Sequence, residues 1–367
     1  MSLVTLLLFV AGLVLLLVGA ELLVKGASRL AALVGISPLV IGLTVVAFGT
    51  SAPELAVSVQ GAWTGAADVA LGNVLGSNVF NVLFVLGLSA LVAPLVVAQQ
   101  LVRVEVPLMI VATVAVFLMA LDRNIGRIDG ALLAGGILAY TVYAVRKSRR
   151  ETKAVQEEYA QEVDGKPRGA AGIALQVGFL VVGLAMLVLG SGWLVDGAVA
   201  IATALGLSER VIALTLVAAG TSLPEVATSV MASARGERDI AVGNAIGSNL
   251  FNLLSVLGCS ALVAPAGIAA AEGSIVFDLP VAIGVAVACL PIFFRDYRIS
   301  RWEGGLFFGY YVLYVAYLFV RISEHPLLGP FTVAMLGFVL PLTAITLVVV
   351  AWRGWRARRA AEAGATR

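Results

Sequence analysis

Apolar stretches long enough to cross a bilayer alternate with short polar connections along almost the whole chain. A transmembrane helix needs roughly 20 apolar residues, and eleven segments of this kind can be marked. They cover residues 3–24, 36–62, 69–92, 104–121, 128–146, 172–195, 209–233, 240–263, 275–294, 303–321 and 330–352. We therefore expect a five-helix unit at 1–146, a polar linker at 147–171, a second five-helix unit at 172–321, one extra helix within 322–352 and a basic tail at 353–367.

The composition agrees with this pattern. Only 13% of the residues are charged and 60% are hydrophobic, whereas soluble domains carry about 25% charged residues. The sequence thus predicts an all-α, polytopic membrane protein in contact with lipid, with neither nucleic acid nor an obligatory protein partner. The first apolar stretch does not fit a cleaved signal peptide, because no basic residue precedes Lys25. Cys259 and Cys289 lie in apolar stretches and indicate no disulfide.

The basic residues predict how the chain crosses the membrane. If the N-terminus lies outside, 20 of the 24 Lys and Arg residues face the cytoplasm, whereas the opposite orientation leaves only four there. Because basic residues concentrate in cytoplasmic loops, we expect the N-terminus outside and the C-terminus in the cytoplasm.

The two predicted units contain an internal repeat. Residues 35–94 align with 206–265 without a gap, and 36 of the 60 aligned positions are identical. The most similar blocks are GTSAPE at 49–54 with GTSLPE at 220–225, and GNVLGSNVFN at 72–81 with GNAIGSNLFN at 243–252. Since five helices is an odd number, the second unit should cross the membrane in the opposite sense. Inverted repeats with interrupted helices are typical of secondary transporters, whose site lies near the bilayer midplane.

The first repeated block places a carboxylate, two hydroxyls and a proline in an apolar environment. An ionisable side chain there costs about 2.5–3.5 kcal/mol on insertion scales and usually marks an ion or substrate path. A purely structural alternative exists, because Ser51 with Glu54, and Ser222 with Glu225, fit capping boxes that would restart a helix. The recurrence of the motif in both units favours a site. A broken helix also frees carbonyl groups that can bind cations.

The second repeated block adds hydroxyls and amides. A serine and an asparagine four residues apart share a helix face, and both units contain that pair: Ser77 with Asn81, and Ser248 with Asn252. Close helix packing could explain the glycines of the block, but it explains the amides less well. One turn back on the same face lie Asn73 and Asn244, whose role is left open, while two amides point elsewhere and are expected to bind backbone, namely Asn78 and Asn249.

All the candidate ligands offer oxygen, and none offers sulfur or imidazole. They are the carbonyls of Ala47 and Ala218 and the side chains of Thr50, Ser51, Glu54, Ser77, Asn81, Thr221, Ser222, Glu225, Ser248 and Asn252. Such a set suits hard cations, and Ca²⁺ in particular takes about six to eight oxygens. The two carboxylates carry −2, which one Ca²⁺, two Na⁺ or two protons would balance. Because an empty buried −2 site is costly, it should change sides only when occupied, which makes exchange of ions natural. Inverted repeats with discontinuous helices favour such alternating access over a cation channel.

No catalytic motif supports an enzyme, and we expect no cofactor. The single histidine, His325, lies in a predicted outer loop, and the chain has neither an HExxH motif nor a nucleophile–base pair.

The paired motifs GTSAPE with GNVLGSNVFN, and GTSLPE with GNAIGSNLFN, resemble the two alpha repeats of the calcium/cation antiporter superfamily. The GTS-x-PE form is similar to its prokaryotic sodium/calcium exchanger branch, and the resemblance covers about residues 1–321. It implies alternating access in a prokaryotic plasma membrane and electrogenic exchange of Na⁺ for Ca²⁺. It also places the family's ion ligands on the twelve positions named above.

The same resemblance bears on the coupling ion. Proton-coupled relatives typically have Asn where this chain has Thr50-Ser51 or Thr221-Ser222, which favours Na⁺; Ca²⁺/H⁺ antiport with the two glutamates as proton carriers is the alternative. Some relatives place Asp at one of the two positions held here by Asn81 and Asn252, which leaves the number of Na⁺ sites open. The linker at 147–171 is too short for the regulatory domain of animal exchangers, and the helix at 330–352 adds to the ten-helix body.

Overall fold

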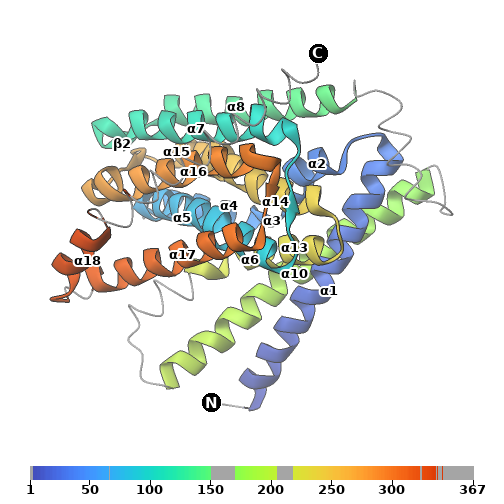
Figure 1. Cartoon of the computed structure of the whole chain (residues 1–367), viewed down its shortest axis with the longest axis horizontal. Coiled ribbons are helices and arrows are strands. Elements are labelled where there is room, and N and C mark those ends of the chain that lie inside the picture. Colours follow the sequence, from blue (N-terminus) through green and yellow to red (C-terminus); the bar gives the residue numbers. More distant parts are fainter. Residues whose placement is uncertain are drawn as a thin grey trace, which may run out of the picture.

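The computed structural model describes residues 3–65, 67–149, 170–204, 218–322 and 325–335, together with 337 and 341, and it consists almost wholly of helices (Figure 1). Within this part of the chain, eight helices are long and apolar enough to cross a membrane, and a bent pair makes a ninth. The predicted spans 209–233 and 330–352 lie partly outside the described residues. The prediction of an all-α membrane fold is confirmed.

The first helix of each unit is longer than predicted. Helix α1 is Leu3–Val34 and α10 is Ala170–Ala204, whereas the apolar pattern ended at 24 and 195. The pattern reports only the apolar part of a helix, and a charged residue such as Lys25 does not end it. The two helices run side by side at one edge of the molecule and extend beyond the other helices (Figure 1). Glycines allow this approach, because a Cβ on Gly19 would lie 2.8 Å from the carbonyl oxygen of Gly183.

Within the described residues, most of the other predicted helices are divided into shorter pieces, whereas the predicted spans 128–146 and 303–321 are each one continuous helix. The first unit contains α2 (Pro38–Ile41), η1 (Gly42–Val46), α3 (Ala47–Thr50), α4 (Ala52–Thr64), α5 (Ala67–Phe80), η2 (Asn81–Leu86), α6 (Gly87–Val92), η3 (Leu101–Glu105), α7 (Val106–Met119), η4 (Ala120–Asp122) and α8 (Arg127–Ser148). The second contains α12 (Ala218–Gly220), α13 (Leu223–Ala234), α14 (Arg238–Phe251), η6 (Asn252–Val256), α15 (Leu257–Val263), η7 (Ser274–Asp278), α16 (Leu279–Asp296) and α17 (Arg301–Ile322), and α18 (Leu328–Ala334) follows. The π-helical turns η2 and η6 begin at the two candidate amide ligands, and such turns are frequent at functional sites.

The two units pack through reciprocal contacts. Helix α8 packs on α15 while its counterpart α17 packs on α6. Two short antiparallel ribbons follow the same rule, since β1 (Leu95–Val96) pairs with β4 (Arg298–Ile299) and β2 (Asn124–Ile125) pairs with β3 (Ile268–Ala269). Reciprocal contacts of this kind are what a two-fold relation between the units produces. The strands were not predicted, because a two-residue strand leaves no alternating pattern in the sequence.

Helix α14 lies at the centre of the packing. Its residues from Ile240 to Phe251 are all buried. In α14 the glycines of the repeated block serve close packing, as the structural alternative proposed, because a Cβ on Gly247 would lie 2.8 Å from both Leu43 and Ala47. In the first unit a Cβ on Gly72 or Gly76 would meet no described atom within 4 Å. Because of the close packing at Gly247, α2, η1 and α3 lie directly against α14, and the polar residues of the repeated blocks are enclosed rather than exposed to lipid.

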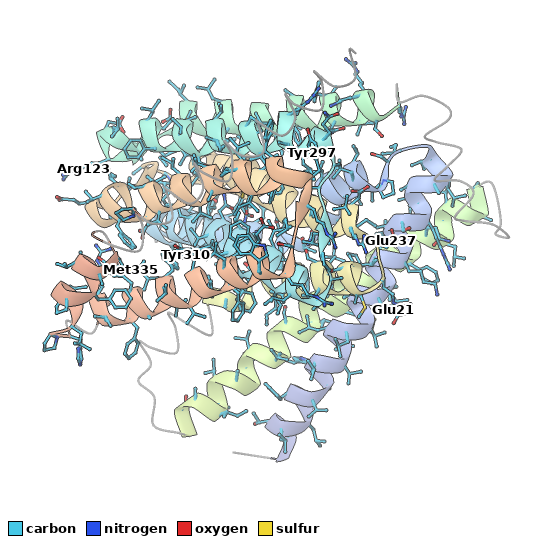
Figure 2. All side chains as sticks on the ribbon, in the orientation of Figure 1. Glu21, Arg123, Glu237, Tyr297, Tyr310 and Met335 are labelled. Carbon is cyan, nitrogen blue, oxygen red and sulfur yellow. The ribbon has the colours of Figure 1, made fainter. Side chains whose placement is uncertain are left out.

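Charged side chains join α1 to the turn between α13 and α14. Arg235 forms an ion pair with Glu21, and Ser28 donates a hydrogen bond of 2.7 Å to Glu237. Figure 2 shows Glu21 and Glu237 at this same corner of the molecule. These contacts give two acidic residues outside the repeated motifs a polar partner at the surface of the protein.

Candidate cation-binding site

The site is built on two interrupted helices. Helix α3 ends at Thr50 and α4 begins at Ala52. The helical segment Pro38–Thr50 is bent by 46° relative to Ala52–Thr64. The equivalent break separates α12 from α13, which begins at Leu223. Each new helix has a proline in its first turn, where the missing N–H leaves no hydrogen bond unmade. Each break therefore presents its hydroxyl groups and the following carboxylate to the interior.

The capping-box alternative is wrong. Neither Ser51 nor Ser222 caps its own helix. Instead, the hydroxyl of Ser51 donates to Glu225 Oε1 at 3.2 Å, and that of Ser222 donates to Glu54 Oε1 at 2.7 Å. A carboxylate is a stronger acceptor than a neutral group, so each serine crosses to the acid of the other unit. The two motifs therefore form one site.

Both carboxylates are fully enclosed and only half satisfied. Glu54 and Glu225 are 0% exposed, and Oε2 of each has no hydrogen-bond partner. Leaving a charged oxygen buried and unpartnered is expensive. A bound cation would supply the missing partner for both.

Neutral oxygens complete the candidate ligand set. Three of them are buried without any hydrogen-bond partner: Thr221 Oγ1, Asn81 Oδ1 and Asn252 Oδ1. The others lie close by, with Ser77 Oγ 3.1 Å from Ser222 Oγ and Ser248 Oγ 3.4 Å from Thr50 Oγ1. The structure thus brings predicted hydroxyls of both units together around the two carboxylates and buries the two predicted amides.

The two predicted carbonyl ligands, Ala47 and Ala218, differ in the hydrogen bonds around them. The carbonyl oxygen of Ala47 accepts the N–H of Ser51 at 3.0 Å and lies 3.3 Å from Thr50 Oγ1. In the second unit the N–H of Ser222 donates to Ala219, at 3.2 Å, rather than to Ala218. Two donors therefore occupy the carbonyl oxygen of Ala47, and a cation there would have to displace the hydroxyl of Thr50.

Another pair of asparagines braces the carboxylate-bearing helices. Asn73 donates to Ser58 Oγ at 2.9 Å and to the carbonyl of Glu54 at 3.4 Å. The same bonds recur in the second unit, at 3.0 Å and 3.5 Å, between Asn244 and the residues Ser229 and Glu225. The serines of these pairs were not predicted. Their position four residues after a glutamate, repeated in both units, was the available signal.

The donor set is dominated by uncharged oxygen. Within the described ranges, no group of three or more His, Cys, Asp or Glu side chains comes together. A cation held here would depend on hydroxyl, amide and carbonyl oxygens as well as on the two carboxylates. Such a set fits Na⁺ and Ca²⁺ and disfavours metals that seek sulfur or imidazole.

Comparison with known proteins defines the class of protein. The family model "Sodium/calcium exchanger protein" matches residues 4–146 and 175–320. A putative antiporter, CaxA of Alkalimonas amylolytica, is 41% identical over 313 residues, covering 82% of this chain and 96% of that protein. The sodium/calcium exchanger MaX1 of Methanosarcina acetivorans is 32% identical over 347 residues, covering 86% and 99%. Structures of the sodium-calcium exchanger NCX_Mj superpose with a TM-score of 0.74 at 29% identity, covering 86% and 99%.

The chain therefore belongs to the sodium/calcium exchanger protein family, and the relatives that it matches over most of its length support the prokaryotic branch that the motifs indicated. It is a multi-pass integral membrane protein and a cation antiporter, not an enzyme.

Proposed function

We propose that the protein exchanges Na⁺ for Ca²⁺ by alternating access, at the site formed by the twelve predicted positions. The observation that carries this proposal is the pair of fully buried carboxylates, Glu54 and Glu225, each with one unpartnered oxygen and each bonded to a serine of the other unit. An ion bound between them contacts both halves of the protein at once. Its presence or absence therefore changes how the halves hold together.

The charge of the site determines how many Na⁺ or Ca²⁺ ions neutralise it. One Ca²⁺ or two Na⁺ neutralise the −2 of the two carboxylates, and a neutral site moves through a low-dielectric interior at the least cost. A third Na⁺ would leave one positive charge on the loaded site. Exchange of three Na⁺ for one Ca²⁺ would consequently move net charge across the membrane.

The neutral oxygens favour Na⁺ over H⁺ as the coupling ion. A proton needs only one carboxylate oxygen. A metal cation needs several oxygens around it, and Asn81, Thr221 and Asn252 each provide a buried oxygen without another partner. Ca²⁺/H⁺ antiport is the alternative, in which the two glutamates would carry protons.

We further propose that the two units have opposite orientations in the membrane, with the N-terminus outside and the C-terminus in the cytoplasm. The strand pairings support this arrangement. The loops that hold β1 and β4 are both cytoplasmic by the charge pattern, and those that hold β2 and β3 are both external. The linker 147–171 and the tail 353–367 would then be cytoplasmic, in a prokaryotic inner membrane.

Transport by the purified chain in liposomes tests the proposal. Vesicles are loaded with Na⁺, with K⁺ or at a different pH, and uptake of radioactive Ca²⁺ is followed after dilution. We expect an outward Na⁺ gradient to drive uptake, and an inside-positive membrane potential, which draws the third Na⁺ outward, to accelerate it. Uptake driven by the pH gradient alone would instead establish the Ca²⁺/H⁺ alternative. Because no other protein is added, activity would also show that no obligatory partner is needed.

A further inference from the structure

Two asparagines beside the site, Asn78 and Asn249, join the central helices α5 and α14. The amide nitrogen of Asn78 donates to the carbonyl oxygen of Asn249 at 3.3 Å, and the amide nitrogen of Asn249 donates to the carbonyl oxygen of Asn78 at 3.3 Å. Both side chains are buried. These backbone contacts confirm the expectation for the two residues, and they form a reciprocal clasp where the helices cross.

The side-chain oxygens of the clasp are used unequally. Asn249 Oδ1 accepts a hydrogen bond of 3.1 Å from the amide of Asn81, so the free oxygen of Asn81 keeps a defined position. The two-fold equivalent of this bond would run from the amide of Asn252 to Asn78 Oδ1. Both of those atoms are buried, and neither has a partner.

Packing explains why the side chain of Asn249 has a more defined orientation than that of Asn78. The amide of Asn249 also lies 3.3 Å from Met109 Sδ, and this contact fixes its orientation. Among the neighbouring hydroxyls, Thr50 Oγ1 donates to Asn244 Oδ1 at 3.0 Å. In this conformation the amide ligand Asn81 is held by the opposite unit, while Asn252 is not.

We propose that Asn249 and Asn78 are positioning residues for the amide ligands Asn81 and Asn252, and that the two side-chain bonds alternate during transport. The structure shows the conformation in which Asn249 holds Asn81. In the conformation open to the other side of the membrane, Asn78 holds Asn252 and Asn81 is released. The inference rests on the proposed function, because it assigns these bonds to the two ends of an alternating-access cycle.

The two bonds should alternate because the two units are related by pseudo-symmetry. If the two units exchange conformations when the site changes sides, each bond of one unit is replaced by its equivalent in the other. A buried amide without a partner is unfavourable. The free pair Asn252 and Asn78 therefore favours the exchange, while the loss of the bond between Asn81 and Asn249 opposes it, so neither conformation is locked.

Sided measurements of Ca²⁺ affinity test the proposal in the full chain. Right-side-out and inside-out vesicles give the apparent KM for Ca²⁺ on each face of the membrane. We expect Asn249→Ala to raise KM roughly two- to tenfold on one face, the value of one lost hydrogen bond, and Asn78→Ala to raise it on the other face. A matched control is Ser260→Ala, which removes a buried, unpartnered hydroxyl on α15 and should change neither. Equal effects of both variants on both faces, or no effect, would overturn the proposal.

A double-mutant cycle measured by Ca²⁺ binding tests the same proposal without relying on transport. It can be used if the transport assay fails because the coupling ion is not Na⁺, or if a variant folds poorly. Equilibrium Ca²⁺ binding to purified protein needs no transport, so it judges this proposal even if Na⁺-driven uptake fails. If Asn249 acts through Asn81, Asn249→Ala weakens binding to the wild-type chain but adds no further loss in an Asn81→Ala background. Asn249→Ser replaces the alanine variant if that variant cannot be purified. Additive losses would mean that Asn249 only supports the fold.

Discussion

Replacing one buried carboxylate by its amide isolates the charge that the site contributes. Glu54→Gln keeps the shape of the side chain and an oxygen that can accept the hydrogen bond of Ser222, whose hydroxyl lies 2.7 Å from Glu54 Oε1 in the native protein. What it removes is one of two negative charges on a residue that is 0% exposed. Bound Ca²⁺ would then leave one uncompensated positive charge in the membrane interior.

The expected magnitude follows from that uncompensated charge. An unbalanced charge within a membrane costs about 2.5–3.5 kcal/mol on insertion scales. Since about 1.4 kcal/mol corresponds to a tenfold change in affinity, Ca²⁺ should bind roughly 100-fold more weakly. The crossed bonds make the site two-fold, so Glu225→Gln should weaken binding by a similar factor.

The assay compares Ca²⁺ titrations of purified variants with Ca²⁺ uptake into liposomes. Glu105→Gln is the matched control, because Glu105 is also 0% exposed with one unpartnered oxygen, but its other oxygen accepts a hydrogen bond of 2.7 Å from Gln100 and not from a hydroxyl of the repeated motifs. We expect near wild-type Ca²⁺ affinity from this control. Wild-type affinity or uptake in either Glu54→Gln or Glu225→Gln would refute the assignment of the site.

Three further outcomes are expected from the contacts described. Ser51→Ala and Ser222→Ala each remove a hydrogen bond to a carboxylate, a bond worth about 1.5–3 kcal/mol, so both should raise the KM for Ca²⁺ about ten- to 100-fold; an effect confined to one of them would contradict a shared site. Gly19→Val places a Cβ 2.8 Å from the carbonyl oxygen of Gly183. The resulting overpacking, worth about 1–3 kcal/mol, should lower the melting temperature in detergent. Gly178→Ala is the control and should leave the melting temperature unchanged, because a Cβ there meets no described atom within 4 Å. Asn252→Asp breaks no hydrogen bond but adds a third negative charge, so the Na⁺ dependence of Ca²⁺ uptake should change more than the melting temperature; the reverse result would mean that this amide supports the fold rather than an ion.

The repeated motifs were sufficient to find the candidate site. An internal repeat of carboxylate, hydroxyl and amide residues in apolar segments has few explanations besides an ion path, because each such residue is costly in a membrane. The same apolar segments predicted nearly every helix. Hydropathy could not place the ends of α1 and α10, since it measures contact with lipid and not helical hydrogen bonding.

The tertiary structure alone decided how the polar groups are used. Serines that fit capping boxes on their own helices instead cross to the carboxylates of the other unit. That choice depends on which acceptor lies within reach after folding, and sequence spacing describes only neighbours on the same helix. The unequal bonds of Asn81 and Asn252 are hidden from the sequence for the same reason. The two motifs are nearly identical as letters, and they differ only in what surrounds them in one conformation of the folded chain. The sequence by itself thus predicted which atoms are candidate cation ligands, and the packing of the two units decided which of those atoms have hydrogen-bond partners in this conformation.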